Sequence, residues 1–286
     1  MGKLIKWLLI IGTLVGLVWY GEQKIGLVTA LLNPEMTQEE ENAYIKSLHD
    51  AILNRDDMVC LQYRGSGSAM DNFSKERLKS AFSLDDPDTS SDYDYMYYTH
   101  KASQISIRGV GNLYFVTYHF DYLQTQEQDA MVEREVKRIL EAQINKKMSD
   151  YKKIKIIHDY MVTHIEYDTS TQQNTPYYAL IEKRSACQGY AALFYKMMTE
   201  AGVPCRVITG KALDGLHAWN IVELNGKWYN IDVTWDDPIG ASGVNLKQQY
   251  KYFLKADSDF RNHVRDEEFN TSTFYNVYPM AKQSYR

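Results

Sequence analysis

The strongest pattern of apolar and polar positions in the chain lies on either side of Asn225-Gly226. The segments HAWNIVEL (217–224) and KWYNIDVTW (227–235) both alternate apolar with polar residues. An Asn-Gly pair between two such runs is the strongest short-range signal for a β-hairpin. The pattern therefore predicts two antiparallel strands joined by a two-residue turn.

This hairpin would bring a histidine and a carboxylate together. Residues two apart share one face of a strand, so His217, Trp219 and Asp232 are expected to project to the same side. His217 and Asp232 would then be diagonal neighbours with Cβ atoms about 7 Å apart, a gap that an imidazole and a carboxylate can bridge. A three-residue loop would instead send Asp232 to the opposite face. The Asn-Gly turn favours the first register.

Helical spacing dominates much of the chain before the hairpin. Thr37 and Glu40 form a capping-box pattern at the start of a helix, and apolar residues at spacings of three and four predict two more helices further on. The predicted elements are a helix over 37–54, a strand over 58–63, a helix over 75–82, a meander within 95–122, and helices over 124–150 and 149–163. They predict three parts: a hydrophobic segment with a linker at 1–34, a small α+β accessory domain at 35–123, and a larger domain at 124–286.

A lone cysteine opens the next helical pattern, SACQGYAALF, at residues 185–194. Ser185 with Gln188 three residues later fits a capping box, which would make Ser185 the N-cap and place Cys187 at the second helical position. The sulfur would lie beside unpaired backbone amides, where the positive end of the helix dipole stabilises an anionic sulfur. Cys187 is therefore a candidate nucleophile.

The three candidate residues follow one another in the chain as nucleophile, base and orienting acid. Cys187 would attack, His217 would exchange the proton, and Asp232 would orient the imidazole. The alternative is that Cys187 is a buried and inert thiol, as many free cysteines are, and that His217 is a surface residue.

The chain opens with a cationic stretch followed by an uncharged apolar run. Lys3 and Lys6 precede the 14 residues 7–20, a pattern typical of an export signal. Small residues around Ala30 would allow cleavage and secretion, whereas an uncleaved segment would anchor the protein in the membrane. We favour the anchor, and the positive-inside bias then predicts an extracytoplasmic catalytic domain.

The charge of the chain limits its possible partners, and its cysteine count bears on free thiols. The net charge of −5 argues against nucleic acid, because phosphate binding draws on a basic surface. Three cysteines leave at least one thiol unpaired in an exported chain.

His158 and His164 are six residues apart, which does not fit the spacing of a helical metal-ligand pair. No metal or other cofactor is predicted. Asp236 and Asp237 before a proline predict a turn after the hairpin.

Four short blocks of sequence resemble the transglutaminase-like superfamily, in particular its bacterial exported members. They are CQGYA (187–191), GVPCRVITG (202–210), HAWN (217–220) and WYNIDVTWDDP (228–238). The resemblance implies an α+β fold with a papain-like core, in which a helix bearing Cys187 packs on an antiparallel sheet bearing His217 and Asp232. A small α+β domain and an N-terminal hydrophobic helix would precede this core.

The resemblance also implies a chemistry. Cys187 would attack a carboxamide or peptide carbonyl, His217 would protonate the departing amine, and water or an amine would resolve the thioester. An enzyme with this chemistry would be a cell-envelope acyltransferase, or else an amidase or peptidase. Its substrates would be proteins or peptides, with cell-wall peptides among the candidates. The family also contains members without activity, so the alternative is a catalytically idle module that binds an extracellular protein or cell-wall partner.

The sequence offers several candidate donors for the oxyanion. Transglutaminases proper use an upstream tryptophan to help hold the oxyanion, and this chain has no tryptophan between Trp19 and Trp219. Gln172, Gln173 and Tyr178 are candidate donors beside the Cys187 amide. Trp219 would line the acyl-donor groove or pack in the core. No calcium-loop pattern is present.

Overall fold

The computed structural model describes residue 19 and residues 35–84, 93–213, 215–237 and 250–286. The predicted hydrophobic segment and linker at 1–34 lie outside this part of the chain, apart from Trp19. Among the helices in the described ranges, none is both long and apolar enough to cross a membrane. The described chain divides into two compact units.

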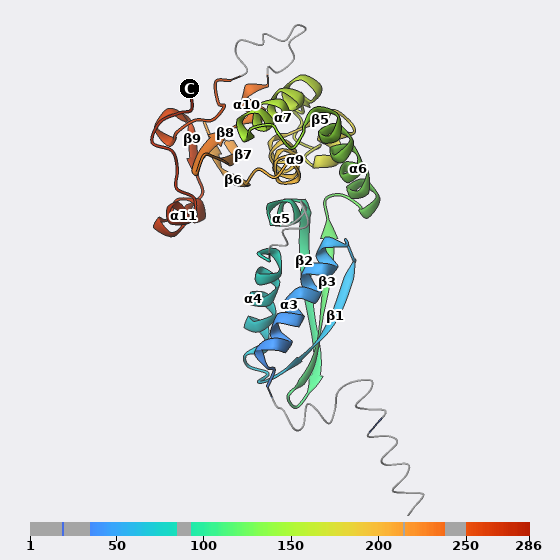
Figure 1. The fold of residues 1–286 in the computed structure, drawn as a ribbon. Coiled ribbons are helices and arrows are strands. Elements are labelled where there is room, and N and C mark those ends of the chain that lie inside the picture. The colour runs from blue at the N-terminus through green and yellow to red at the C-terminus, as the bar shows by residue number, and fades with distance from the viewer. Residues whose placement is uncertain (1–18, 20–34, 85–92, 214, 238–249) are drawn as a thin grey trace, which may run out of the picture. The chain divides into compact units, whose positions relative to one another are not determined.

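The smaller unit comprises residues 35–84 and 102–121. Its three-stranded sheet has the order β1-β3-β2, with β1 antiparallel to β3. The Thr37 and Glu40 capping box is present as predicted, and the Tyr44 and Tyr118 hydroxyls, 2.9 Å apart, join a helix to the sheet. The elements, drawn in blue to green in Figure 1, are α3 (Gln38–Leu53), β1 (Met58–Arg64), α4 (Met70–Phe82), β2 (His100–Val110) and β3 (Leu113–Tyr122).

The larger unit comprises residues 93–101 and the chain from Tyr122 onward. It begins with α5 (Asp94–Thr99), α6 (Gln126–Gln143), α7 (Asp150–His164), β4 (Glu166–Tyr167), α8 (Pro176–Leu180), β5 (Arg184–Ser185) and α9 (Cys187–Glu200). It continues with β6 (Cys205–Ala212), β7 (Gly215–Leu224), β8 (Lys227–Ile231), α10 (Val233–Asp236), η2 (Asp257–Asp259), β9 (His263–Arg265), η3 (Glu267–Phe269) and α11 (Ser272–Val277).

The sheet of the larger unit, in the order β8-β7-β6-β9, is antiparallel throughout and covered on both faces. On one face Asn220 donates to the Ala191 carbonyl of α9 at 3.0 Å. On the other face Trp219 packs with Phe260 of the C-terminal segment. Because both faces are covered, six successive residues of β7, 217–222, are buried. The α+β fold with the Cys187 helix packed on an antiparallel sheet is therefore confirmed (Figure 1).

The predicted hairpin is present with its two-residue turn. Leu224 pairs with Lys227, and Asn225 and Gly226 have φ values of 56° and 73°, the left-handed geometry that an Asn-Gly turn of this type requires. The second strand ends earlier than predicted, at Ile231, because the Asp232 side chain accepts from the Trp235 amide at 3.0 Å and caps α10.

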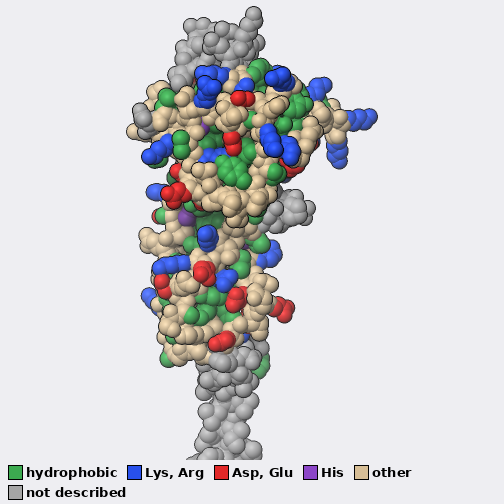
Figure 2. Space-filling view, turned by 90° about the vertical axis from the view of Figure 1, so that its left-hand side faces the viewer, with side chains coloured by type: hydrophobic (Ala, Val, Ile, Leu, Met, Phe, Trp, Pro, Cys, Tyr) green, Lys and Arg blue, Asp and Glu red, His purple; other side chains and the backbone are tan. Residues whose placement is uncertain are grey.

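Side chains of both charge signs occupy the surface. On the face shown in Figure 2, basic and acidic side chains are interspersed. Among the described residues, Lys75 and Asp71 form an exposed ion pair one helical turn apart at 2.7 Å. The visible face therefore has no continuous basic stripe of the kind that nucleic-acid binding uses.

Candidate active site

Cys187 is the first residue of α9 and is half-buried. The predicted N-cap is wrong, since the N-cap residue is Ala186, which makes no side-chain cap. Ser185 lies in β5, and its hydroxyl donates to the Gln173 carbonyl at 3.1 Å. Gln188 donates its side-chain amide to a carbonyl of α5 at 2.8 Å. The capping-box pattern fails because the β4-β5 pairing holds Ser185, yet the thiol still lies at a helix N-terminus.

Asn174 takes the capping role that the sequence assigned to Ser185. Its side-chain oxygen accepts from the Gly189 amide at 3.0 Å. Gly189 leaves no space for a side chain, because a Cβ there would lie 2.1 Å from the Ser185 hydroxyl and 2.8 Å from the Thr175 carbonyl oxygen. The first turn of α9 therefore packs directly against the loop before α8. The polar sequence TSTQQNTP marks this loop but does not single out Asn174.

His217 lies between the other two candidate residues. Its Nε2 is 2.7 Å from Oδ2 of Asp232, and the thiol of Cys187 lies near enough to the ring to raise its pKa. Burial lowers the pKa of His217, but the hydrogen bonds with Asp232 and Cys187 outweigh it and raise the pKa from 6.5 to about 9. The imidazole is therefore positively charged at neutral pH.

Asp232 is fully buried and accepts three hydrogen bonds. Its Oδ2 lies 2.7 Å from His217 Nε2 and 2.8 Å from Nε2 of His263, and its Oδ1 accepts from the Trp235 amide. Burial raises the pKa of Asp232, but the hydrogen bonds with His217 and His263 lower it further than burial raises it. His263 lies 31 residues beyond Asp232 and outside the motif blocks, so nothing in the sequence pattern pointed to it.

The same three side chains could also hold a metal ion. His217, Asp232 and His263 each offer one ligand atom, and these atoms lie within 4.8 Å of one another. Two imidazoles and a carboxylate are a donor set that transition metals accept. The short N···O distances are those of charge-assisted hydrogen bonds.

The remaining predicted site residues make their own contacts in the segment before α9. Gln173 donates its backbone amide to Asp168 at 3.0 Å, and Gln172 is exposed with its amide on Ser170. Tyr178 stacks edge-on against a neighbouring tyrosine. None of the contacts recorded in the described ranges joins Gln172, Gln173 or Tyr178 to Cys187. The role of these three residues as oxyanion donors therefore stays a prediction.

Trp219 packs against His217 and also lines a pocket together with Phe260 and His263. It is 1% exposed, its ring stacks on the His217 ring at 6.1 Å between centroids, and its indole N–H donates to Asn230 at 3.3 Å. This position fits core packing, the alternative left open for Trp219 by its sequence.

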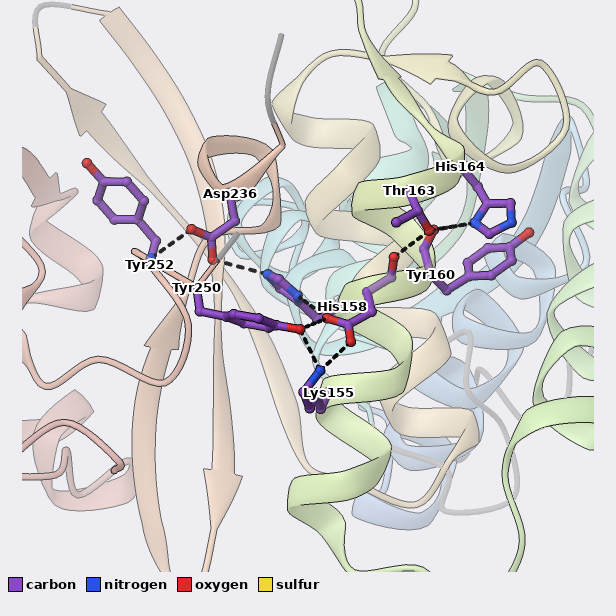
Figure 3. A network of polar contacts seen from close by, with 9 residues as sticks. Lys155, His158, Tyr160, Thr163, His164, Asp236, Tyr250 and Tyr252 are labelled. Carbon is purple, nitrogen blue, oxygen red and sulfur yellow. Dashed lines mark hydrogen bonds and ion pairs between the residues drawn. The ribbon is translucent and has the colours of Figure 1, made fainter. Parts of the chain in front are cut away.

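Asp236 anchors the segment that carries Asp232. In Figure 3, His158 of α7 reaches Asp236 through Nε2 at 3.1 Å and Asp159 through Nδ1 at 3.2 Å. Asp236 also accepts from the Tyr252 amide at 2.8 Å. Burial lowers the pKa of His158, but the bonds with Asp159 and Asp236 raise it overall. The predicted turn at Asp236 thus becomes a buried attachment to α7.

Asp237 makes the matching attachment to the cysteine helix. Tyr190, one turn after Cys187 in α9, donates its hydroxyl to Asp237 at 2.5 Å. Burial raises the pKa of Asp237 to about 6, although the bond from Tyr190 acts in the opposite direction. The chain just after Asp232 is therefore tied to both α7 and α9.

Comparisons with known proteins show which proteins the sequence of this chain resembles. Residues 137–233, which include all three candidate residues, match the model of the transglutaminase-like superfamily. Mouse (Mus musculus) kyphoscoliosis peptidase is 29% identical over 162 residues, covering 50% of this chain and 24% of that protein. The human (Homo sapiens) protein of that name is 31% identical over 143 residues, covering 42% and 22%. The matched region thus spans less than a quarter of either relative.

A crystal structure of a TGase aligns with a TM-score of 0.35 at 17% identity, covering 46% of this chain and 44% of that one. This similarity is too low to support any inference. The sequence matches are sufficient to say that the chain carries a transglutaminase-like core domain, as the sequence blocks indicated.

The Asp236 attachment predicts a stability effect. In Asp236→Ala, the imidazole of His158 and the Tyr252 amide lose their buried partner, and both side chains of the ion pair are fully buried. We expect the free energy of unfolding in urea to fall by about 3 kcal/mol. The control Asp50→Ala, in the exposed pair with Lys46, should lose under about 1 kcal/mol. Equal losses in the two variants would contradict the anchoring role.

The raised pKa of His217 predicts a pH dependence of stability. Because the folded pKa lies above the ordinary value of 6.5, the protonated ring stabilises the fold. That contribution is complete below about pH 6.5 and is lost as the pH rises through about 9. The measurement is the difference in unfolding free energy between wild type and His217→Gln at about pH 6, 7.5 and 10. A difference that is constant or grows with pH would be the contrary result.

Proposed function

We propose that Cys187, His217 and Asp232 form the catalytic triad of a cysteine acyltransferase or peptidase that acts on protein or peptide carboxamides. The observation that carries the proposal is the imidazole of His217, which is hydrogen-bonded to a buried carboxylate at 2.7 Å and whose pKa is raised by that carboxylate and by the nearby thiol of Cys187. Nucleophile, base and orienting acid are the three parts that thiol catalysis requires.

The charge on His217 favours the first step. A protonated imidazole next to the sulfur stabilises a thiolate, the form of cysteine that attacks carbonyl carbon. The sulfur adds to the carbonyl, and the resulting tetrahedral intermediate collapses when His217 gives its proton to the departing amine. A thioester remains on Cys187. Water or a second amine then attacks the thioester, while neutral His217 accepts a proton from that nucleophile.

Backbone amides of α9 supply the oxyanion donors in this proposal. The first amides of a helix have no partner within it. Among the contacts of the described chain, the Gly189 amide is engaged by Asn174 and the Tyr190 amide by Ala186. The amides of Cys187 and Gln188 are the donors that remain, and they lie at the same helix end as the sulfur.

The alternative function is an idle module that binds an extracellular partner. Such a module would have no need of a buried carboxylate aligned behind an imidazole, since burying a charge costs free energy unless it is paired. The arrangement of His217 and Asp232 therefore favours the enzyme.

The proposed enzyme acts outside the cytoplasm, held by an N-terminal membrane segment. The support for this part is the sequence alone: the cationic and apolar pattern over residues 3–20, which falls outside the described ranges apart from Trp19. Peptides of the cell envelope are then candidate substrates.

The reactivity of the three thiols tests the triad without knowledge of the substrate. Cys60 is exposed, Cys187 half-buried and Cys205 buried, so exposure alone would make Cys60 react first. The proposal predicts the reverse: iodoacetamide near neutral pH should label Cys187 at least about tenfold faster than Cys60. Burial raises the pKa of Cys205, which should remain unlabelled. Site-resolved mass spectrometry provides the rates, and slow labelling of Cys187 would favour the idle module.

The fate of the thioester distinguishes transfer from hydrolysis. Because both matched relatives are named peptidases, we expect incubation with casein and a fluorescent amine to yield new peptide N-termini with little amine incorporated. Cys187→Ser should abolish the product, whereas the control Cys60→Ser should not. Strong amine incorporation would assign the acyltransferase branch instead. Product formation by Cys187→Ser would contradict the proposed nucleophile.

A further inference from the structure

We propose that His263 is a positioning residue for the reaction, acting through Asp232 to hold His217 in line with the thiol. This inference rests on the proposed function of the triad. Its basis is a shared acceptor: Oδ2 of Asp232 lies 2.7 Å from Nε2 of His217 and 2.8 Å from Nε2 of His263. The contact network thus runs from the sulfur through one imidazole and the carboxylate to a second imidazole.

The fold holds His263 firmly in this place. His263 is the first residue of β9 and pairs with Ala212 of β6. Strand β9 forms one edge of the sheet and β8 forms the other. Its side chain is 1% exposed, in a ring of aromatic side chains. The ring centroids lie 4.1 Å from Phe260, 4.5 Å from Trp235 and 5.1 Å from Trp219.

Packing alone does not account for a histidine in this ring of side chains. A phenylalanine would fill a similar volume and would not bring a polar ring into an apolar cluster, which costs free energy unless the polar atoms are paired. Both ring nitrogens of His263 face oxygen acceptors: Nε2 faces Asp232, and Nδ1 lies 3.2 Å from the Arg261 carbonyl oxygen. The contact of Nε2 with the carboxylate of the proposed triad at 2.8 Å therefore explains why a polar ring occupies this place.

In this proposal, His263 is the second donor that fixes the orientation of the Asp232 carboxylate. His217 alone would fix one oxygen and leave Asp232 free to turn about that contact. His263 fixes the same oxygen from a second direction, and the Trp235 amide holds the other oxygen at 3.0 Å. With three donors from three elements, the plane of the carboxylate is set, and with it the orientation of the His217 ring. A misplacement of about 1 Å in such a constellation can cost about a hundredfold in rate.

The competing interpretation is a metal site made from the same atoms. His217, Asp232 and His263 would then be ligands, and a bound ion would occupy the place of the two hydrogen bonds. The experiment separates the two interpretations, because a metal would suppress the base function of His217 until it is removed by a chelator.

The test compares His263→Phe, which keeps a ring but removes the donor, with His263→Gln, whose side-chain nitrogen lies at about the place of Nε2. Phe260→Leu loosens the same cluster and leaves both imidazole contacts with Asp232 in place, so it controls for packing. All variants carry Cys60→Ser to remove the exposed thiol. The readout is the ratio of Cys187 alkylation rates by iodoacetamide at about pH 6.5 and about pH 9.5, which cancels differences in access.

We expect the ratio to fall about tenfold in His263→Phe, as for loss of one hydrogen bond to a charged group. It should stay within about threefold of wild type in His263→Gln and in Phe260→Leu. An unchanged ratio in His263→Phe, or an equal fall in Phe260→Leu, would overturn the positioning role. A metal ion that stays bound to the protein in stoichiometric amount, together with faster alkylation of Cys187 after a chelator is added, would show a metal site instead.

His217→Phe serves as the reference for the proposed function. If it lowers the ratio while His263→Phe does not, the triad stands and only the role of His263 fails. If His217→Phe also leaves the ratio unchanged, the proposed triad itself fails.

Discussion

The proposed site depends on one buried charge, the carboxylate of Asp232. A carboxylate without solvent is stable only when donors surround it, and here the donors come from β7, β9 and the start of α10. In the proposed triad, the same contacts orient His217 toward the thiol. The hydrogen bonds that stabilise the buried charge of Asp232 are therefore the same bonds that would make the thiol of Cys187 reactive.

The surrounding elements restrain the position of Asp232 through residues that follow it in the chain. Asp236 is bound by His158 of α7, and Asp237 by Tyr190 of α9. The second of these helices also begins with Cys187, so the proposed nucleophile and the segment after Asp232 are joined through α9. Conformational changes that separate α9 from α10 would break buried hydrogen bonds, each costly to leave unsatisfied.

Local sequence was sufficient to predict part of this arrangement. The Asn225-Gly226 turn predicted the hairpin register, because a two-residue turn fixes which side chains share a face. The helix that begins at Cys187 was predicted from apolar spacing. Its N-cap was not, because the β4-β5 pairing holds Ser185, while Asn174 caps the helix from a loop that only tertiary folding brings near. His263 could not be found for the same reason: β9 reaches Asp232 only through its pairing with β6.

The most direct test of the account is the titration of the His217 ring, followed by nitrogen NMR in wild type and in Asp232→Asn. The account predicts a midpoint near the pKa of about 9 in wild type and a clear fall in the variant, because the neutral amide no longer stabilises the imidazolium. A wild-type midpoint near 6.5, unaffected by the substitution, would contradict the coupling of carboxylate, imidazole and thiol on which the proposed chemistry rests.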